Sequence, residues 1–241
     1  SMLECASYNQ NRKATNINLF EISNVYKQEK MQTRLGIVLN GELQSSRSHK
    51  ISIKNDFYVI KGLIQAYLEK LGIASSRITF DKNEDSNFFH PYRSAKVYIQ
   101  NKLFGTFGEI HPAYAKKLDL SDVIYGEFIM DVLFEIKTSK LKFTTLDKYP
   151  SVSRDIALIV DRNLESKKIL DTITKNGGKL IKSLEIFDIY TGEHVDADKK
   201  SVALTIVYQS KEKTLTEAEV SEVHNNILAK LEKEVQAILR S

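Results

Sequence analysis

The sequence predicts an α+β protein with two units, a mixed or antiparallel first unit and a smaller second sheet with two helices. In the first 140 residues, one helical pattern of apolar side chains lies among several strand patterns. After Pro150 the patterns follow the order strand, helix, strand, strand, helix, strand, which is the split βαβ arrangement of ferredoxins. A chain of 241 residues has room for two modest domains. We place them at residues 1–140 and 148–241, joined by the polar, lysine-rich stretch 138–148.

The first unit begins with two strand patterns, at residues 18–22 and 34–39. The second pattern ends at Asn40-Gly41, a pair that accepts positive φ. Residues 56–71 predict a helix, because apolar side chains recur there at helical spacing, and Gly72 is a suitable end. The other expected elements are a hairpin over 97–110, a short helix over 112–118 and a strand over 126–132.

The second unit begins with the apolar run Asp155–Val160, which is long enough for one buried strand. Gly177-Gly178 is typical of a helix end, and Thr216 with Glu219 three residues later predicts a capping box. The expected elements are strand 155–160, helix 166–176, strands 181–190 and 201–208, helix 216–232 and strand 235–239.

Strand parity assigns the residues of the second sheet to two faces, because both helices of such a fold cover the same face. Arg154 has inward parity at the start of its strand, which favours a structural ion pair or cap, and Leu239 is placed inward beside the outward Arg240. The rest of the inward set is Ile156, Leu158, Val160, Phe187, Ile189, Val202, Leu204, Ile206 and Tyr208. The outward set is Asp155, Ala157, Asp188, Tyr190, Ser201, Ala203, Thr205 and Arg240. This mixture of small and polar residues with one aromatic ring and one arginine suits flat, unstacked bases.

Composition and charge are those of an ordinary globular protein, with 42% hydrophobic and 27% charged residues. No apolar run is long enough to span a membrane, and the N-terminus has no secretory pattern. Basic and acidic residues are equal in number from Lys148 onward, so the net charge of +4 lies in residues 1–147. A neutral second unit can bind RNA only through a few placed groups and stacking. The single cysteine, Cys5, excludes an internal disulfide and fits a cytoplasmic location.

The candidate catalytic and metal-binding residues lack suitable partners. His90 and His111 belong to two His-Pro pairs, but we expect them to be turn or packing residues, because no further ligands follow at metal-binding spacing. The other residues considered as ligands are Cys5, His49, His194 and His224. We place Cys5 on an unstructured end, which disfavours Cys–His catalysis. The sequence also has no Gly-rich phosphate loop, nucleophile elbow or paired catalytic carboxylates.

Four motifs in the second half occur in a fixed order and together carry a family resemblance. They are Tyr149-Pro150-Ser151-Val152-Ser153-Arg154-Asp155, the run Glu185–Gly192, the run Lys199–Leu204 and the run Lys213–Val220, with Leu239-Arg240 at the end. They resemble the ferredoxin-fold anticodon-binding domain that closes the bacterial phenylalanyl-tRNA synthetase beta subunit. The first unit resembles the class II synthetase-like core of the same subunit, which lacks the ATP-binding signature arginines. Its matching motifs are Leu3-Glu4, Tyr8-Asn9, Asn11-Arg12-Lys13, Asp56-Phe57, Lys61-Gly62 and the two His-Pro segments.

The resemblance implies that Asp188, Tyr190, Ser201 and Arg240 face a tRNA anticodon. Asp188 and Ser201 would hydrogen-bond base edges, Tyr190 would stack, and Arg240 would stack or bind phosphate. The resemblance further implies a C-terminal fragment of a beta subunit in a heterotetramer of two alpha and two beta chains. Phenylalanine, ATP and Mg²⁺ would then be used by the alpha subunit to charge tRNA-Phe, and this chain alone would bind no cofactor and catalyse nothing. Two alternatives stay open, a small-molecule regulatory domain and a protein-assembly domain of ferredoxin-like fold.

Overall fold

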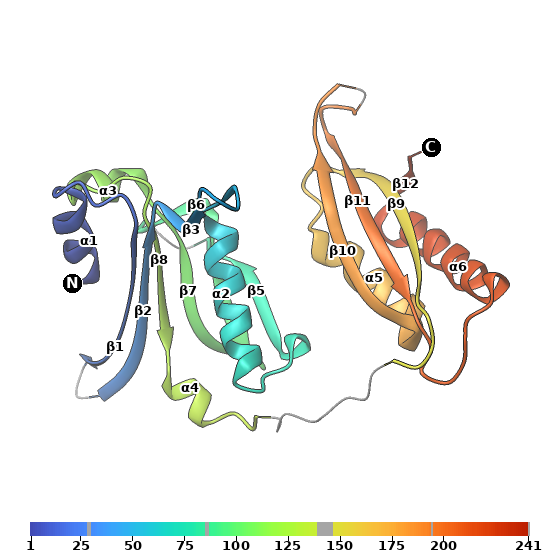
Figure 1. The fold of residues 1–241 in the computed structure, drawn as a ribbon, viewed down its shortest axis with the longest axis horizontal. Helices are drawn as coiled ribbons and strands as arrows, with labels where there is room; N and C mark the ends of the chain where they lie inside the picture. Colours follow the sequence, from blue (N-terminus) through green and yellow to red (C-terminus); the bar gives the residue numbers. More distant parts are fainter. Residues whose placement is uncertain (28–29, 85–86, 139–146, 194, 241) are drawn as a thin grey trace. The chain divides into compact units, whose positions relative to one another are not determined.

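The computed structural model describes residues 1–27, 30–84, 87–138, 147–193 and 195–240, which form two compact units (Figure 1). The boundary between the units falls between residues 142 and 143. Most of the predicted joining stretch 138–148 lies outside the described residues. Among the described residues, none of the helices is long and apolar enough to cross a membrane.

The first unit is built on a six-stranded sheet in which every neighbouring pair of strands is antiparallel. The strand order is β1-β2-β8-β7-β6-β5. The strands are β1 (Ile17–Lys27), β2 (Lys30–Asn40), β5 (Ile78–Lys82), β6 (Phe89–Ile99), β7 (Lys102–Ile110) and β8 (Ile124–Ile129). The predicted α+β class with antiparallel sheets is therefore confirmed.

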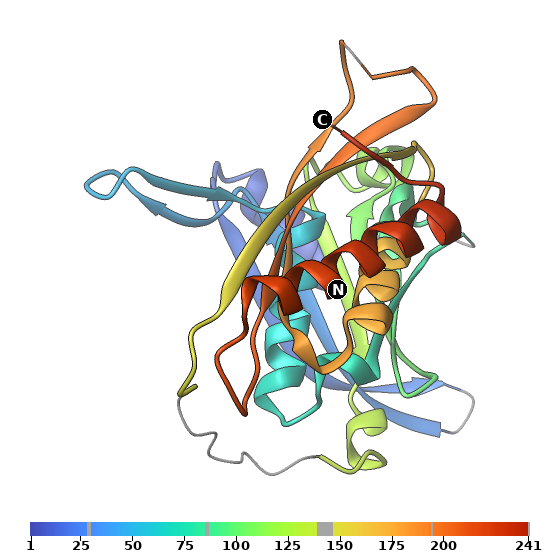
Figure 2. The same cartoon turned by 90° about the vertical axis from the view of Figure 1, so that its right-hand side faces the viewer.

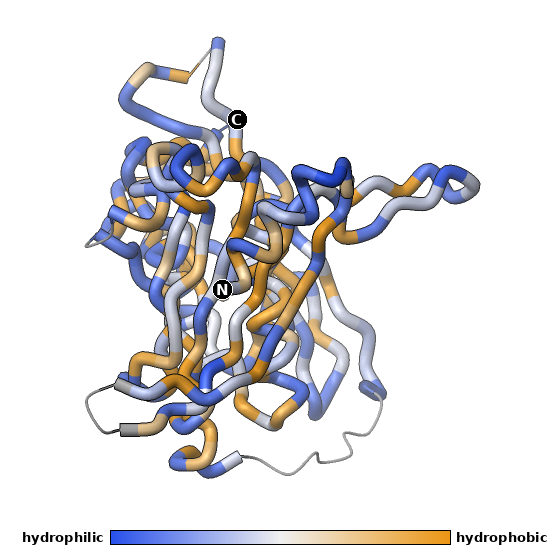
Figure 3. The backbone as a smooth tube through the Cα atoms, turned by 90° about the vertical axis from the view of Figure 1, so that its left-hand side faces the viewer, coloured by the Kyte–Doolittle hydropathy of each residue, from blue (hydrophilic) through white to orange (hydrophobic). Residues whose placement is uncertain are grey.

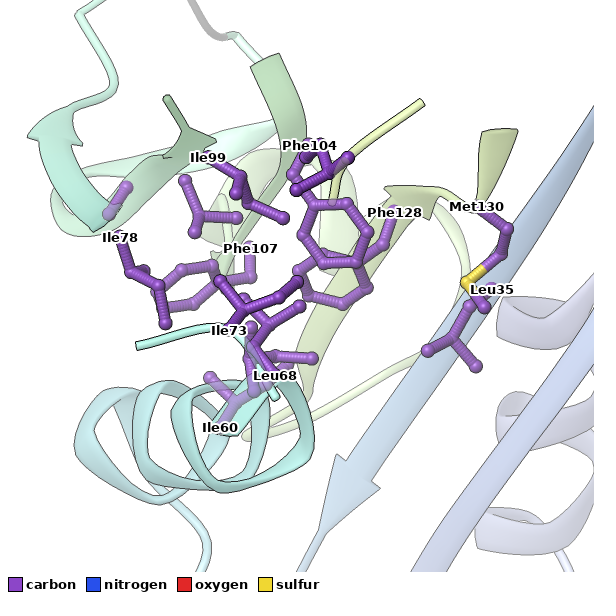
Figure 4. Packing of buried hydrophobic residues seen from close by; sticks show 14 of the residues in the cluster. Leu35, Ile60, Leu68, Ile73, Ile78, Ile99, Phe104, Phe107, Phe128 and Met130 are labelled. Carbon is purple, nitrogen blue, oxygen red and sulfur yellow. The ribbon is translucent and has the colours of Figure 1, made fainter. Parts of the chain in front are cut away.

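Helices cover both faces of this sheet. Helix α2 (Phe57–Lys70) buries Ile60, Ile64 and Leu68 against Phe104, Phe107 and Phe128 of the sheet (Figure 4). The opposite face forms a second core, in which Leu3 and Ala6 of α1 (Met2–Gln10) lie with Val38 of β2. The remaining short helices are α3 (Pro112–Lys117), α4 (Asp131–Phe134) and the 3₁₀ turn η1 (Ser75–Arg77).

A two-stranded hairpin, β3 (Glu42–Ser46) and β4 (Ile51–Lys54), projects from the rest of the first unit (Figures 2 and 3). The sequence prediction missed this hairpin, strand β5 and helix α1. Helix α1 buries only Leu3 and Ala6, so its apolar periodicity is too weak to recognise. The expectation that Cys5 lies on an unstructured end was therefore wrong, because Cys5 is part of this helix.

The second unit has the expected order of elements, and its sheet has the strand order β10-β11-β9-β12. The strands are β9 (Val152–Asp161), β10 (Ile181–Tyr190), β11 (Lys199–Tyr208) and β12 (Ile238–Leu239). The helices are α5 (Ser166–Gly177) and α6 (Glu217–Val235), with the 3₁₀ turn η2 (Gly178–Leu180) after α5. The ferredoxin-like prediction is confirmed, although α6 is longer and β12 shorter than expected.

Two local signals in the second unit position its helices. Gly178 has a φ of 55° directly after α5, a conformation that glycine adopts without strain. At the start of α6, the Thr216 side chain accepts from the Glu219 backbone while the Glu219 side chain accepts from the Thr216 backbone. The predicted helix end and capping box are both confirmed, and both helices pack on the same sheet face.

A β-bulge in β10 overturns part of the parity assignment. Ile186 lies opposite Leu204, and after an extra residue Asp188 lies opposite Ala203 and Ile189 opposite Val202. The extra residue, Phe187, is 57% exposed, so the prediction that it packs inward was wrong. Ile189 has the predicted helix-side register but is also exposed, because the core ends before this part of β10.

Candidate nucleic-acid interface

The sheet of the second unit has one face without a helix over it in the described part of this unit, here called the open face. Strand register arranges its side chains in rows that run across the strands. The first row, called the Tyr190 row, consists of Tyr190, Ser201, Ile159 and Ile238. The second row, called the Asp188 row, consists of Asp188, Ala203, Ala157 and Arg240, in which the Arg240 backbone N–H donates to the Ala157 carbonyl at 2.8 Å. The four residues predicted to face an anticodon thus lie in two adjacent rows.

Asp188 and Arg240 lie at opposite ends of the Asp188 row with two alanines between them. Both side chains are exposed, and the described part of the chain gives the Asp188 carboxylate no hydrogen bond or ion pair. The alanine methyl groups leave a flat strip between the backbones of the two charged residues, and the Arg240 side chain extends over part of it toward Ser201. A planar ring can lie on such a strip with an acceptor at one edge and a donor at the other.

Ser201 does not have the predicted exposure. Its residue is only 4% exposed, and its Oγ accepts a hydrogen bond from Arg240 Nη1 at 3.4 Å. The expectation that Ser201 offers its hydroxyl on an open surface was therefore wrong, since neighbouring side chains of the same face cover it. Because β9 lies between β12 and β11, the Arg240 side chain crosses β9 to reach Ser201. Ser201 thus acts as a positioning residue for the guanidinium.

Tyr190 is held by the turn that follows β10. Its hydroxyl donates to the Glu193 carbonyl at 3.3 Å. Gly192 makes this position possible, because a Cβ there would lie 2.6 Å from the Tyr190 hydroxyl oxygen and 2.8 Å from Cζ. The ring remains 40% exposed, enough for one side of it to accept a stacked base. Sequence reasoning missed Gly192, although it lies two residues after a predicted stacking residue.

A third row limits the open face on the side away from Tyr190. Asp155 lies opposite Thr205, whose Oγ1 donates to Asp155 Oδ1 at 2.6 Å, and Glu185 lies on the other side of Thr205. Two carboxylates in one row repel phosphate. The chemistry that favours a nucleic acid is therefore confined to the Tyr190 and Asp188 rows.

The helix side of the sheet contains polar groups with structural roles. Arg154 forms an ion pair with Glu217 in the first turn of α6, as its inward parity predicted. Nearby, the buried Tyr208 hydroxyl lies 2.9 Å from Nδ1 of His224. Burial, followed by the charge of Arg154, lowers the pKa of His224, and burial raises the pKa of Tyr208 to about 12. These residues connect α6 to the sheet and lie away from the open face.

Comparisons with known proteins agree with this arrangement. Residues 1–130 match the family model described as the phenylalanyl tRNA synthetase beta chain CLM domain, and residues 147–240 match the ferredoxin-fold anticodon binding domain. The chain belongs to the phenylalanyl-tRNA synthetase beta chain family. The anticodon binding domain match favours this family over the small-molecule regulatory and protein-assembly alternatives.

Relatives in the beta chain family match this sequence along almost its whole length. It is 35% identical over 246 aligned residues to the phenylalanine–tRNA ligase beta subunit of Bacillus subtilis. The alignment covers 100% of this chain and 30% of the relative. The Bacillus licheniformis subunit is 36% identical with the same coverage. The Staphylococcus aureus subunit is 34% identical over 236 residues, 95% of this chain and 29% of the relative. The chain thus spans about 30% of the length of these relatives.

The two His-Pro pairs of this beta chain family member lie in strand β6 and at the start of helix α3. His90 Nδ1 accepts from the Tyr92 backbone N–H, and His111 Nδ1 accepts from the Ala113 backbone N–H, both at 3.2 Å. His111 also caps α3, so its interpretation as a turn residue is confirmed, whereas His90 lies within β6, where the pairing with β7 shifts register between Phe89 and Ser94. Within the described ranges, no group of three or more His, Cys, Asp or Glu side chains has the geometry to hold a metal ion.

Proposed function

We propose that this chain is a non-catalytic part of a phenylalanine–tRNA ligase whose second unit binds the anticodon of tRNA-Phe. The observation that carries this proposal is the Asp188 row, in which a carboxylate and a guanidinium flank two alanines; among the described residues, the carboxylate has no partner and no helix covers this face. The match of residues 147–240 to an anticodon binding domain supports it independently.

Each group in the two rows has a chemical role in this proposal. A base lies flat over Ala203 and stacks on Tyr190, while Asp188 accepts hydrogen bonds from the amino or imino groups at its edge. Arg240, oriented by Ser201, stacks on an adjacent base or binds its phosphate. Because basic and acidic residues balance from Lys148 onward, these placed contacts provide the affinity instead of a general positive charge.

The remaining parts of the proposal concern the complete enzyme. The first unit supports assembly with an alpha subunit in a heterotetramer of two alpha and two beta chains. The alpha subunit uses phenylalanine, ATP and Mg²⁺ for aminoacylation in the cytoplasm. The absence of a Gly-rich phosphate loop or ATP-binding arginine pattern in the sequence supports a non-catalytic role for this chain.

The test is binding of this chain to a hairpin RNA with the anticodon loop of tRNA-Phe, measured by fluorescence anisotropy across a salt series. We expect tighter binding of this hairpin than of one with an exchanged anticodon. Arg240→Ala and Asp188→Asn should each weaken binding roughly tenfold, the cost of one lost base or phosphate contact. Lys233→Ala is the matched control for Arg240→Ala, because it removes one positive charge from an exposed position of α6. Equal binding of both hairpins, or equal effects of the two charge removals, would contradict the proposal.

A further inference from the structure

The Tyr190 row continues beyond the residues assigned to anticodon binding. Ile159 lies opposite Ser201, and Ile238 lies opposite Ile159 on the edge strand β12. Tyr190 and Ile238 are therefore three strand spacings apart, about 14 Å. This length exceeds one nucleobase, so a base stacked on Tyr190 leaves the far end of the row uncovered.

The far end of the row is an apolar surface at the edge of the sheet. Ile238 is 54% exposed, and the neighbouring Ile159 is half-buried. The Arg240 side chain crosses β9 toward Ser201 beside them, so a guanidinium adjoins the aliphatic surface. An aliphatic floor next to a guanidinium is a suitable environment for a planar, partly apolar ring with a phosphate nearby.

We propose that Ile159 and Ile238 form a second nucleobase subsite, which takes an unpaired base next to the one stacked on Tyr190. This inference rests on the proposed function, because it assumes that an RNA strand crosses the open face. The strand would run across β11 and β9 toward β12, with one base at Tyr190 and the next over the two isoleucines. The Arg240 guanidinium lies between the two positions and contacts the phosphate or the ring of either nucleotide.

The chemistry of the two subsites differs in a measurable way. At the Tyr190 end, the Asp188 carboxylate accepts hydrogen bonds and so distinguishes bases by their donors. The isoleucine side chains have no donors or acceptors, so the second subsite contributes apolar contact without selecting a base. We expect any of the four bases at that position to bind equally well, and an abasic nucleotide there to bind less tightly.

The test uses the complete 241-residue chain and hairpin RNAs that carry a single abasic nucleotide at each anticodon position in turn. Ile238→Ala should weaken binding of the intact hairpin roughly fivefold to tenfold, near the lower limit for loss of one base contact. With the hairpin that is abasic at the position occupying this subsite, the same substitution should have no effect. Ile238→Phe should bind the intact hairpin at least as tightly as the original chain does, since an aromatic ring offers a larger stacking surface.

Leu239→Ala is the matched control. Leu239 is the next residue of the same edge strand and is 52% exposed, almost the same as Ile238, but it lies opposite Leu158 on the helix side. The inference requires that Leu239→Ala leaves RNA affinity unchanged. Equal effects of the two substitutions would mean that they disturb β12 generally, and no effect of Ile238→Ala would eliminate the second subsite. If Tyr190→Ala and Arg240→Ala weaken binding in that case, the proposed function stands without the subsite; if they do not, the proposed function itself fails.

Discussion

The two sheets of this protein differ in how many of their faces are covered. In the first unit, consecutive residues of β2 are buried on opposite sides, with Leu39 in the core under α2 and Val38 in the core beside α1. In the second unit, Val202 and Leu204 of β11 are buried under the helices, whereas Ala203 and Thr205 on the other face remain half-buried. One sheet is thus the centre of a domain, and the other presents a surface.

The two sheets also differ in whether their charged side chains are paired with each other. In the first unit, Arg34 of β2 forms an ion pair with Glu127 of β8, so the two charges are paired within the domain. In the second unit, the backbones of Asp188 and Arg240 lie at opposite ends of one row, and no ion pair joins their side chains in the described part of the chain. Charges held apart on a flat surface are available to a ligand, which is why we assign function to the open face and a structural role to the first sheet.

The largest expected effect is the loss of stability when a core aromatic ring of the first unit is removed. Phe107 is fully buried and stacks on Phe57 with ring centroids 5.4 Å apart. Phe107→Ala should therefore lower the free energy of unfolding of the first unit by about 3–5 kcal/mol. Scanning calorimetry should show that the unfolding transition of the first unit moves to lower temperature while that of the second unit is unchanged.

The matched variant for the second unit is Leu158→Ala, which removes a side chain that is 1% exposed in the core under α5 and α6. It should lower the unfolding free energy of that unit alone, by about 2–5 kcal/mol. If either substitution shifts both transitions equally, the units do not unfold independently and the contrast between them has no thermodynamic basis.

A smaller effect, on RNA affinity, is expected from Gly192→Ala. The added methyl group would overlap the Tyr190 ring, because the Cβ position is 2.8 Å from its Cζ. The displaced ring should weaken binding of the anticodon hairpin by about 1–2 kcal/mol, as expected for loss of one stacking contact. In a double-mutant cycle, Gly192→Ala should have no further effect once Tyr190 is alanine. An undiminished effect in that background would show that Gly192 acts independently of the ring.

Much of the second unit could be predicted from its sequence, because its signals are local. The apolar run of β9, Gly178 and the Thr216–Glu219 capping box each determine structure within a few residues. The position of Phe187 could not be predicted, because a bulge depends on the partner strand and shifts the parity of every residue after it. Ser201 is buried and accepts a hydrogen bond from the Arg240 side chain 39 residues away, a contact that strand parity does not describe.

A pH-dependent loss of stability is expected from His224, on the helix side of the second unit. Burial lowers its pKa below the usual value of about 6.5, so the unfolded chain binds more protons than the folded one just below that pH. The stabilising contribution is therefore complete above about pH 6.5 and is lost as the pH falls through this range. Glu219, whose pKa is about 2 because of Lys213 and the Thr216 backbone, affects stability only at more acidic pH.

Urea unfolding of the second unit at about pH 7.5 and about pH 5.5 measures this contribution of His224. The His224→Gln variant keeps a neutral group that can hydrogen-bond the Tyr208 hydroxyl, so its stability should depend less on pH than that of the original chain. An equal pH dependence in both proteins would assign the effect to other groups.

The smallest expected effect concerns Leu239, which strand parity placed in the core. Its register opposite Leu158 agrees with that placement, but its side chain is 52% exposed, because β12 consists of only two residues at the edge of the sheet. Leu239→Ala should therefore lower the free energy of unfolding by less than about 1 kcal/mol, well below the cost for a buried leucine. Denaturant titration of Leu239→Ala and Leu158→Ala, two residues that face each other across β9 and β12, measures this difference directly. If Leu239→Ala lowers the free energy of unfolding as much as Leu158→Ala does, the helix side of β12 belongs to the core of the second unit. The helices would then cover one more strand of this sheet than we infer.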